Sequence, residues 1–121
     1  MNYVDEIARA VAERCNERWD ILPDEARSLY RVYAVLVLTT GGDTTNQNVH
    51  DAWAAWRAAT MPDHKSLVPF DRLSPEVQEL DTPYREAIRA IAALAYRVDF
   101  EAITETADGR QVDLVRRRRE V

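Results

Sequence analysis

The apolar positions of the first forty residues follow the period of an α-helix. A first helix is expected over residues 3–19, because apolar side chains recur there at steps of three or four. Pro23 suits the first turn of a second helix, which is expected over residues 23–40. The segment 32–38 is apolar on all sides, which indicates the most buried element of the fold. Its β-branched residues also permit a strand, but its length and spacing favour a helix.

The same pattern predicts two further helices and a short helical turn. Two glycines follow residue 40, and Thr44 or Thr45 can cap a helix over residues 45–60. A Ser-Pro pair opens a short turn at 75–80, and an Asp-Thr-Pro sequence opens a last helix over 83–98. The predicted core consists of Leu36, Trp56, Leu67, Val68, Phe70, Ile88 and Ile91.

Beyond the last helix the periodicity changes. Residues 100–106 and 111–115 alternate with period two around the turn sequence Asp108-Gly109, which predicts a short C-terminal β-hairpin. Two isolated strands are marginally stable in water, so the hairpin is expected to pack on the helices or to pair with a second copy as a homodimer.

The prediction is therefore a mainly α, compact four-helix fold in one domain, residues 1–121. A chain of 121 residues supports one core. We divide it into an N-terminal helical pair (1–45), a central helical segment (46–98), and the hairpin with a basic tail (99–121).

The charge distribution narrows the possible partners. The net charge is −5, and the C-terminal run Arg116–Arg119 with Glu120 contributes +3, which leaves −8 on the residues before it. An acidic body repels a phosphate backbone, so duplex nucleic acid is not an expected partner. The arginine run is expected to be a solvated tail, although it could also contact nucleic acid or anionic lipid.

Localisation follows from what the sequence lacks. No apolar run approaches the 18 residues of a membrane span, and the acidic, amphipathic N-terminus is unlike a secretory signal. A single cysteine, Cys15, cannot form an intramolecular disulfide and suits a reducing cytoplasm, which is the expected location. Cys15 lies on the apolar face of the first helix, where we expect it to pack in the core.

The residues that enzymes use are scarce. The two histidines, His50 and His64, each have an aspartate as a direct sequence neighbour, and adjacent side chains on a helix point apart. No paired-histidine, CxxC or glycine-rich phosphate-binding motif is present. We therefore expect a protein that is not an enzyme and holds no metal and no cofactor.

Five residues are candidates for binding a ligand. His50, Trp53 and Arg57 share one stripe of the third helix, and His64 and Lys65 lie on the following loop. An aromatic ring, an imidazole and a guanidinium could together stack a base and hold a phosphate. The plainer interpretation is a half-buried Trp, a rim His and a solvated Arg, beside a loop that anchors its apolar residues in the core.

A family resemblance bears on this choice. The sequences VHDAW (49–53) and HKSLVPFDRL (64–73), followed by an acidic segment at 75–81 and a helix at 87–96, resemble the RyR repeat domain of ryanodine receptors and of small bacterial and phage proteins. The resemblance covers residues 46–98. It implies that the chain binds a small, nucleotide-derived ligand, as a sensor in defence signalling or as a phage sponge for the signal.

Two functions remain open from the sequence. The first is a non-catalytic module that binds a small nucleotide-derived signal. The alternative is a protein-interaction or structural module that pairs through the C-terminal hairpin or an apolar helix face. A binding pocket requires the stripe of the third helix to converge with the loop, whereas an interaction module requires an exposed apolar patch.

Overall fold

The computed structural model describes the backbone of residues 1–105 and the side chains of residues 1–94. Its elements, in chain order, are α1 (Tyr3–Arg14), η1 (Trp19–Ile21), α2 (Asp24–Thr39), η2 (Gly41–Asp43), α3 (Asn46–Thr60), η3 (Phe70–Arg72), α4 (Pro75–Glu79) and α5 (Thr82–Glu105). The η elements are single 3-10 turns. The fold is mainly α, as predicted, and the described residues contain no strand.

The predicted helices over 23–40, 45–60 and 75–80 are confirmed as α2, α3 and α4. The strand alternative for the apolar segment 32–38 is excluded, because that segment lies inside α2. The first helix is shorter than predicted. It ends at Arg14 because Asn16 adopts a left-handed conformation with φ 64°, which asparagine tolerates better than most residues.

Short polar side chains begin three of the helices. Asn2 accepts a hydrogen bond from the Asp5 amide at the start of α1, and Ser74 accepts one from the Val77 amide at the start of α4. Thr45 forms a capping box with Asn48 at the start of α3. Of the two predicted caps for α3, Thr45 is therefore the cap, whereas Thr44 is fully buried.

The predicted C-terminal hairpin is wrong in its first strand. Residues 100–105 form the end of α5, which runs to Glu105 instead of ending at residue 98. No Gly or Pro interrupts the chain between Pro83 and Gly109, so nothing in this stretch breaks a helix. The turn and the second strand of the predicted hairpin, together with the arginine run, lie outside the described residues.

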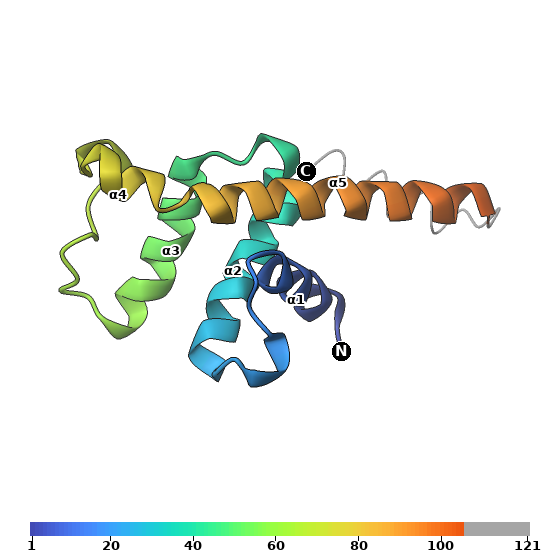
Figure 1. Cartoon of the computed structure of the whole chain (residues 1–121), viewed down its shortest axis with the longest axis horizontal. Coiled ribbons are helices and arrows are strands. Elements are labelled where there is room, and N and C mark those ends of the chain that lie inside the picture. Colours follow the sequence, from blue (N-terminus) through green and yellow to red (C-terminus); the bar gives the residue numbers. More distant parts are fainter. Residues whose placement is uncertain (106–121) are drawn as a thin grey trace.

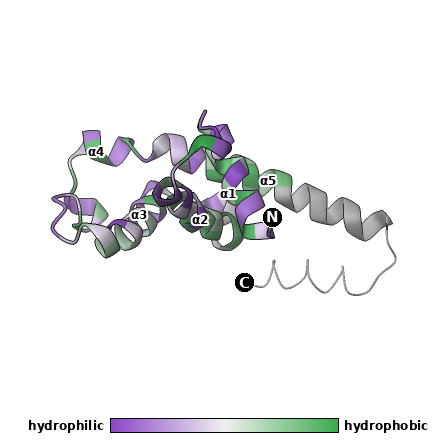
Figure 2. Ribbon diagram, turned by 90° about the horizontal axis from the view of Figure 1, so that it is seen from below, coloured by the Kyte–Doolittle hydropathy of each residue, from purple (hydrophilic) through white to green (hydrophobic). Residues whose placement is uncertain are grey.

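The core forms where α1, α2 and the first half of α5 meet. Figure 1 shows α5 crossing α2 beside α1, and in Figure 2 the hydrophobic segments gather at this junction. Alanines on α1 and α5 allow the helices to approach closely, and larger side chains fill the space between them. The buried hydrophobic residues are Ala8, Val11, Ala12, Trp19, Tyr30, Tyr33, Ala34, Val37, Val49, Ala87, Ile88, Ile91 and Ala92.

The predicted core is correct for the last helix and less so for the loop. Ile88 and Ile91 are buried, whereas Leu36, Trp56, Leu67 and Phe70 are only partly buried. Cys15 is also partly buried and packs against the core, and burial raises the pKa of its thiol. The prediction is wrong for Val68, whose side chain is 37% exposed. The loop turns the backbone carbonyl of Val68, rather than its side chain, toward His50.

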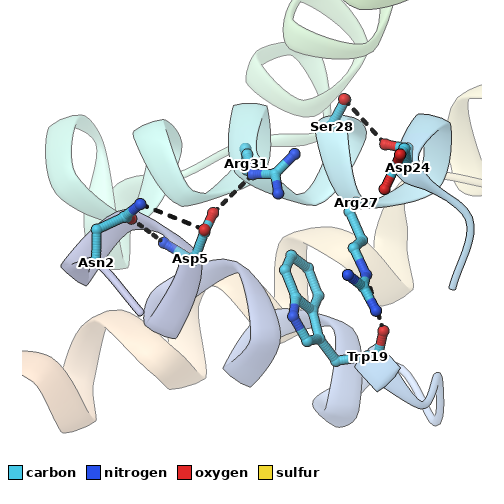
Figure 3. Close-up of polar contacts among 7 residues, drawn as sticks. All are labelled: Asn2, Asp5, Trp19, Asp24, Arg27, Ser28 and Arg31. Atoms are coloured by element: carbon cyan, nitrogen blue, oxygen red, sulfur yellow. Dashed lines mark hydrogen bonds and ion pairs between the residues drawn. The ribbon is translucent and has the colours of Figure 1, made fainter. Parts of the chain in front are cut away.

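A buried tryptophan that the sequence did not place in the core joins α1 to α2. The Arg27 Nε donates to the Trp19 carbonyl at 3.0 Å, and its guanidinium carbon lies 5.2 Å from the centre of the indole ring (Figure 3). The Arg31 guanidinium lies 5.8 Å from the same ring and pairs with Asp5 at the start of α1. Cation–π contacts and charge-assisted bonds thus orient the two N-terminal helices.

The connection between α2 and α3 is held against α5. Gly41 has a φ of 54°, and a Cβ added there would lie 3.7 Å from the Ala92 Cβ. The carbonyl of the buried Thr44 accepts a hydrogen bond of 2.7 Å from the Arg89 Nε. This contact joins the segment before α3 to α5.

Candidate functional site

A pocket of about 270 Å³ opens beside α2 and α3, where the 61–69 loop and the α4–α5 junction close around it. Its lining residues come from α2, α3, α4, the start of α5 and the loop that follows α3. Its lining residues are Leu29, Tyr33, His50, Trp53, His64, Ser66, Val77, Leu80, Asp81 and Tyr84.

Five of the ten lining side chains are aromatic when the two histidines are counted. On α3, the rings of His50 and Trp53 stack with centroids 5.7 Å apart, and the His64 ring meets Trp53 edge-on at 5.0 Å. The rings of Tyr33 on α2 and Tyr84 on α5 lie 5.4 Å apart. These contacts hold two sets of rings in fixed positions around one cavity, which suits a flat ligand.

His50 connects α3 to the loop. It is 4% exposed, and its Nε2 lies 2.7 Å from the Val68 carbonyl oxygen. Because a carbonyl only accepts, Nε2 carries the proton and donates it to this bond. The bond satisfies a buried polar side chain and holds the loop against α3, while the same ring lines the pocket.

His64 is oriented by its own loop. Its Nδ1 accepts a hydrogen bond of 3.0 Å from the backbone amide of Ser66. The ring proton is therefore on Nε2 while this bond is formed. His64 and Ser66 both line the pocket, so the turn that contains them presents two polar groups to the same cavity.

Asp81 is the one carboxylate among the described residues that line this pocket. It directly precedes α5, and its backbone carbonyl accepts the first helical hydrogen bond, from the Arg85 amide. Burial raises the pKa of its side chain to about 6, against the opposing influence of nearby His50. No hydrogen bond joins its carboxylate to another described residue. Burial also raises the pKa of Tyr33 and of Tyr84, so both hydroxyls stay protonated at neutral pH.

The structure brings three of the five predicted site residues together. His50, Trp53 and His64 line the pocket. Arg57 does not, because its Nη1 pairs with Glu25 of α2 at 3.0 Å and its guanidinium lies 4.2 Å from the centre of the Trp56 ring. Lys65 is exposed and lies between two lining residues without lining the pocket itself.

Seven of the ten lining residues were not among the predicted site residues, and three of these, Tyr33, Asp81 and Tyr84, contribute rings or a carboxylate. Asp81 belongs to the Asp-Thr-Pro sequence that opens the last helix, Tyr33 lies in the apolar segment 32–38, and Tyr84 follows Pro83 in the first turn of the last helix. These local positions do not mark them as site residues. The three share a site because α2 packs on α5, which no short motif in the sequence encodes.

A second, open hollow lies on the other side of His50. Its volume is about 410 Å³, and it is lined by His50, Asp51, Ala54, Ala55, Ala58, Leu67, Val68 and Pro69. Alanines and loop apolar side chains dominate it, so it offers a ligand little polar contact. The first pocket, with its aromatic walls and carboxylate, is therefore the better candidate site.

The described part of the chain contains neither a candidate metal site nor a candidate membrane-spanning helix. No group of three or more His, Cys, Asp or Glu side chains within it is placed to hold a metal ion. None of its helices combines the length and apolar character needed to cross a membrane.

Comparison with known proteins gives one result. The model of a family described as a domain of unknown function, DUF7701, matches residues 2–93. Neither the curated proteins nor the solved structures include a match. The matched range covers the pocket and its supporting helices, and the similarity to the RyR repeat stays a prediction.

Proposed function

Because the chain belongs to DUF7701, a family defined as a domain of unknown function, we propose its function from the pocket: it is a non-catalytic module that binds the base of a small, nucleotide-derived ligand. The resemblance of residues 46–98 to the RyR repeat supports the same ligand class. On this proposal the protein is a sensor or a sponge for a nucleotide signal.

The observation that carries the proposal is that two sets of rings, from different helices, line one cavity. Trp53 with its histidine neighbours faces the pocket from α3 and the loop, and the Tyr33–Tyr84 pair faces it from α2 and α5. Stacking on an aromatic ring contributes about 1–3 kcal/mol per base. A cavity of about 270 Å³ is small for a drug-sized ligand, which supports one ring system entering rather than a whole dinucleotide.

The charges support an orientation for such a ligand. No Lys or Arg is among the residues lining the pocket, so phosphate groups are better placed outside it. Lys65 is exposed between the lining residues His64 and Ser66, where its flexible ammonium can reach a phosphate at the mouth. The base then lies inside, between the rings, and the charged part of the ligand stays in solvent.

The backbone fixes the orientation of both histidine rings. The Nε2 proton of His50 is donated to the Val68 carbonyl, and the Nδ1 of His64 accepts from the Ser66 amide. These bonds hold the two rings in position, which supports a role for both histidines in shaping the pocket.

A thermal-shift screen against cyclic di- and trinucleotides, nucleoside monophosphates and ADP-ribose tests the proposal. A ligand at one hundred times its Kd stabilises the folded state by about 2.7 kcal/mol, which raises the Tm measurably. Tryptophan fluorescence gives a second readout, since a base stacked on Trp53 should quench its emission.

Two matched variants separate the pocket from the rest of α3. Trp53→Leu removes a lining ring, whereas Trp56→Leu removes an equally large, partly buried ring of the same helix that does not line the pocket. We expect Trp53→Leu to weaken binding by about 5- to 150-fold, the equivalent of one lost stacking contact, and Trp56→Leu to leave it nearly unchanged. If no nucleotide binds, or if both variants weaken binding equally, the proposed function is wrong.

A further inference from the structure

The Asp81 carboxylate is a hydrogen-bond acceptor without a partner among the described residues. It stands at the start of α5, a position where aspartate often accepts from the backbone amides of the first turn. The side chains of Asn2, Thr45 and Ser74 do this at the starts of α1, α3 and α4. Asp81 instead lines the pocket, where its burial is unfavourable until something donates to it.

The groups around Asp81 do not neutralise it. His50 faces it from α3, and the hydroxyls of Tyr33 on α2 and Tyr84 on α5 are close enough to interact with its charge. Both tyrosines line the same pocket, and no lysine or arginine joins them there. A ligand that fills the space between the rings therefore meets a carboxylate at its edge.

The nucleobases differ in what they offer to a carboxylate. Guanine presents two adjacent donors, its N1–H and its 2-amino group, which can pair with both oxygens of one carboxylate. Adenine and cytosine each place an amino donor beside a ring nitrogen that accepts, so one of the two contacts is repulsive. Uracil has a single N–H between two carbonyls. Paired bonds to a charged acceptor are shorter and stronger than neutral ones.

From this arrangement we propose that the pocket is specific for a guanine base, whose N1–H and 2-amino groups donate to the Asp81 carboxylate while its ring lies between Trp53 and the Tyr33–Tyr84 pair. The proposal rests on the proposed function, because it assumes that a base enters this pocket. It adds the identity of the base and the residue that selects it.

If the Asp81 carboxylate selects guanine, the preference for guanine depends on pH. The Asp81 carboxyl titrates at about 6, so it is ionised at pH 7.5 and largely protonated at pH 5. The protonated acid can donate to the N1 of adenine and accept from its 6-amino group. Toward guanine it can accept a hydrogen bond from only one of the two donors, because its own O–H faces the other donor. The preference for guanine therefore weakens as the pH falls.

Calorimetric titration of the full chain with GMP, AMP, CMP and UMP at pH 7.5 and pH 5 tests the proposal. We expect GMP to bind at least tenfold more tightly than AMP at pH 7.5, and this ratio to fall at pH 5. Asp81→Asn should reverse the preference, because an amide pairs with adenine through one donor and one acceptor. Asp51→Asn, an exposed aspartate of α3 beside the other hollow, is the matched control and should keep the preference for GMP.

The outcomes distinguish the two proposals. If AMP binds as tightly as GMP and binding still depends on Trp53, or if Asp81→Asn keeps the preference for GMP, the guanine assignment is wrong and the ligand-binding function stands. If no nucleotide binds at either pH, both are wrong. Circular dichroism of Asp81→Asn confirms that the variant is folded before either result is interpreted.

Discussion

The most informative single change is Asp81→Asn, because the same carboxylate that is proposed to select the ligand also costs stability. In the folded chain its pKa is about 6, whereas an unburied aspartate titrates near 3.8. The folded state therefore holds the proton more tightly than the unfolded state does. Between these two pH values the free energy of unfolding falls as the pH rises, and above pH 6 the whole cost is present.

The size of the effect follows from this difference. For a fully buried group, this difference between the folded and unfolded pKa corresponds to about 3 kcal/mol of the free energy of unfolding. Asp81 is only partly buried, and solvent screening reduces the figure to about 1 kcal/mol. Asparagine has nearly the same shape and no charge. We therefore expect Asp81→Asn to raise the Tm at pH 7.5 by about 4 °C and to change it little at pH 3.5, where the wild-type carboxyl is mostly protonated.

The assay is thermal unfolding followed by circular dichroism at pH values from 3.5 to 8, in the absence of nucleotide. Asp71→Asn is the control, since Asp71 is exposed in η3, and its stability difference from the wild type should stay small across the range. If Asp81→Asn destabilises the protein at pH 7.5, the carboxylate has a stabilising partner and the reasoning is refuted. A gain that does not change with pH would refute the assigned titration.

Three further predictions concern the scaffold. Ile88→Ala removes a fully buried side chain and should lower the free energy of unfolding, measured in urea, by about 2–5 kcal/mol. The control Leu94→Ala removes a half-exposed side chain of the same helix and should lower it by less than about 0.5 kcal/mol. Equal losses would contradict the core described for α5. Gly41→Ala should lower the free energy of unfolding by about 1 kcal/mol because of the positive φ at this position, since the new Cβ has ordinary contact distances. Gly42→Ala should lower it by less. A smaller effect at Gly41 than at Gly42 would show that the backbone relaxes. Removing residues 106–121 and measuring the mass by light scattering tests the protein-interaction alternative: a fall from dimer to monomer would favour it, and an unchanged mass would contradict pairing through this segment.

Much of the fold is determined locally and could be predicted from the sequence. The starts of α2, α3 and α4 follow from Pro23, Thr45 and the Ser74-Pro75 pair, because a helix start depends on the residues that precede and cap its first amides. The end of α5 was misjudged because a short alternating stretch is compatible with both a helix and a strand. The absence of Gly and Pro between Pro83 and Gly109 was the better guide there.

The sequence also identified three of the ten residues that line the pocket. His50 and Trp53 are three residues apart on a helix and His64 follows on the next loop, so their proximity depends on short-range geometry and could be anticipated. Arg57 has the same spacing but is drawn to Glu25 of α2, a partner that lies far away in the sequence. Helical periodicity places a residue on a stripe but does not determine which neighbour it pairs with.

The remainder of the pocket was decided by tertiary structure alone. Tyr33 and Tyr84 meet because small residues on α1 and α5 let the helices pack closely around α2, and this brings Asp81 to the edge of the same cavity. Each of these residues has an ordinary local role, as a core ring or a helix start. Their shared role arises from burial, because the packed helices shield the Asp81 carboxylate in part from water, and no described residue donates a hydrogen bond to it. A sequence specifies the chemical groups, and the packing of distant helices decides which of them are left for a ligand to satisfy.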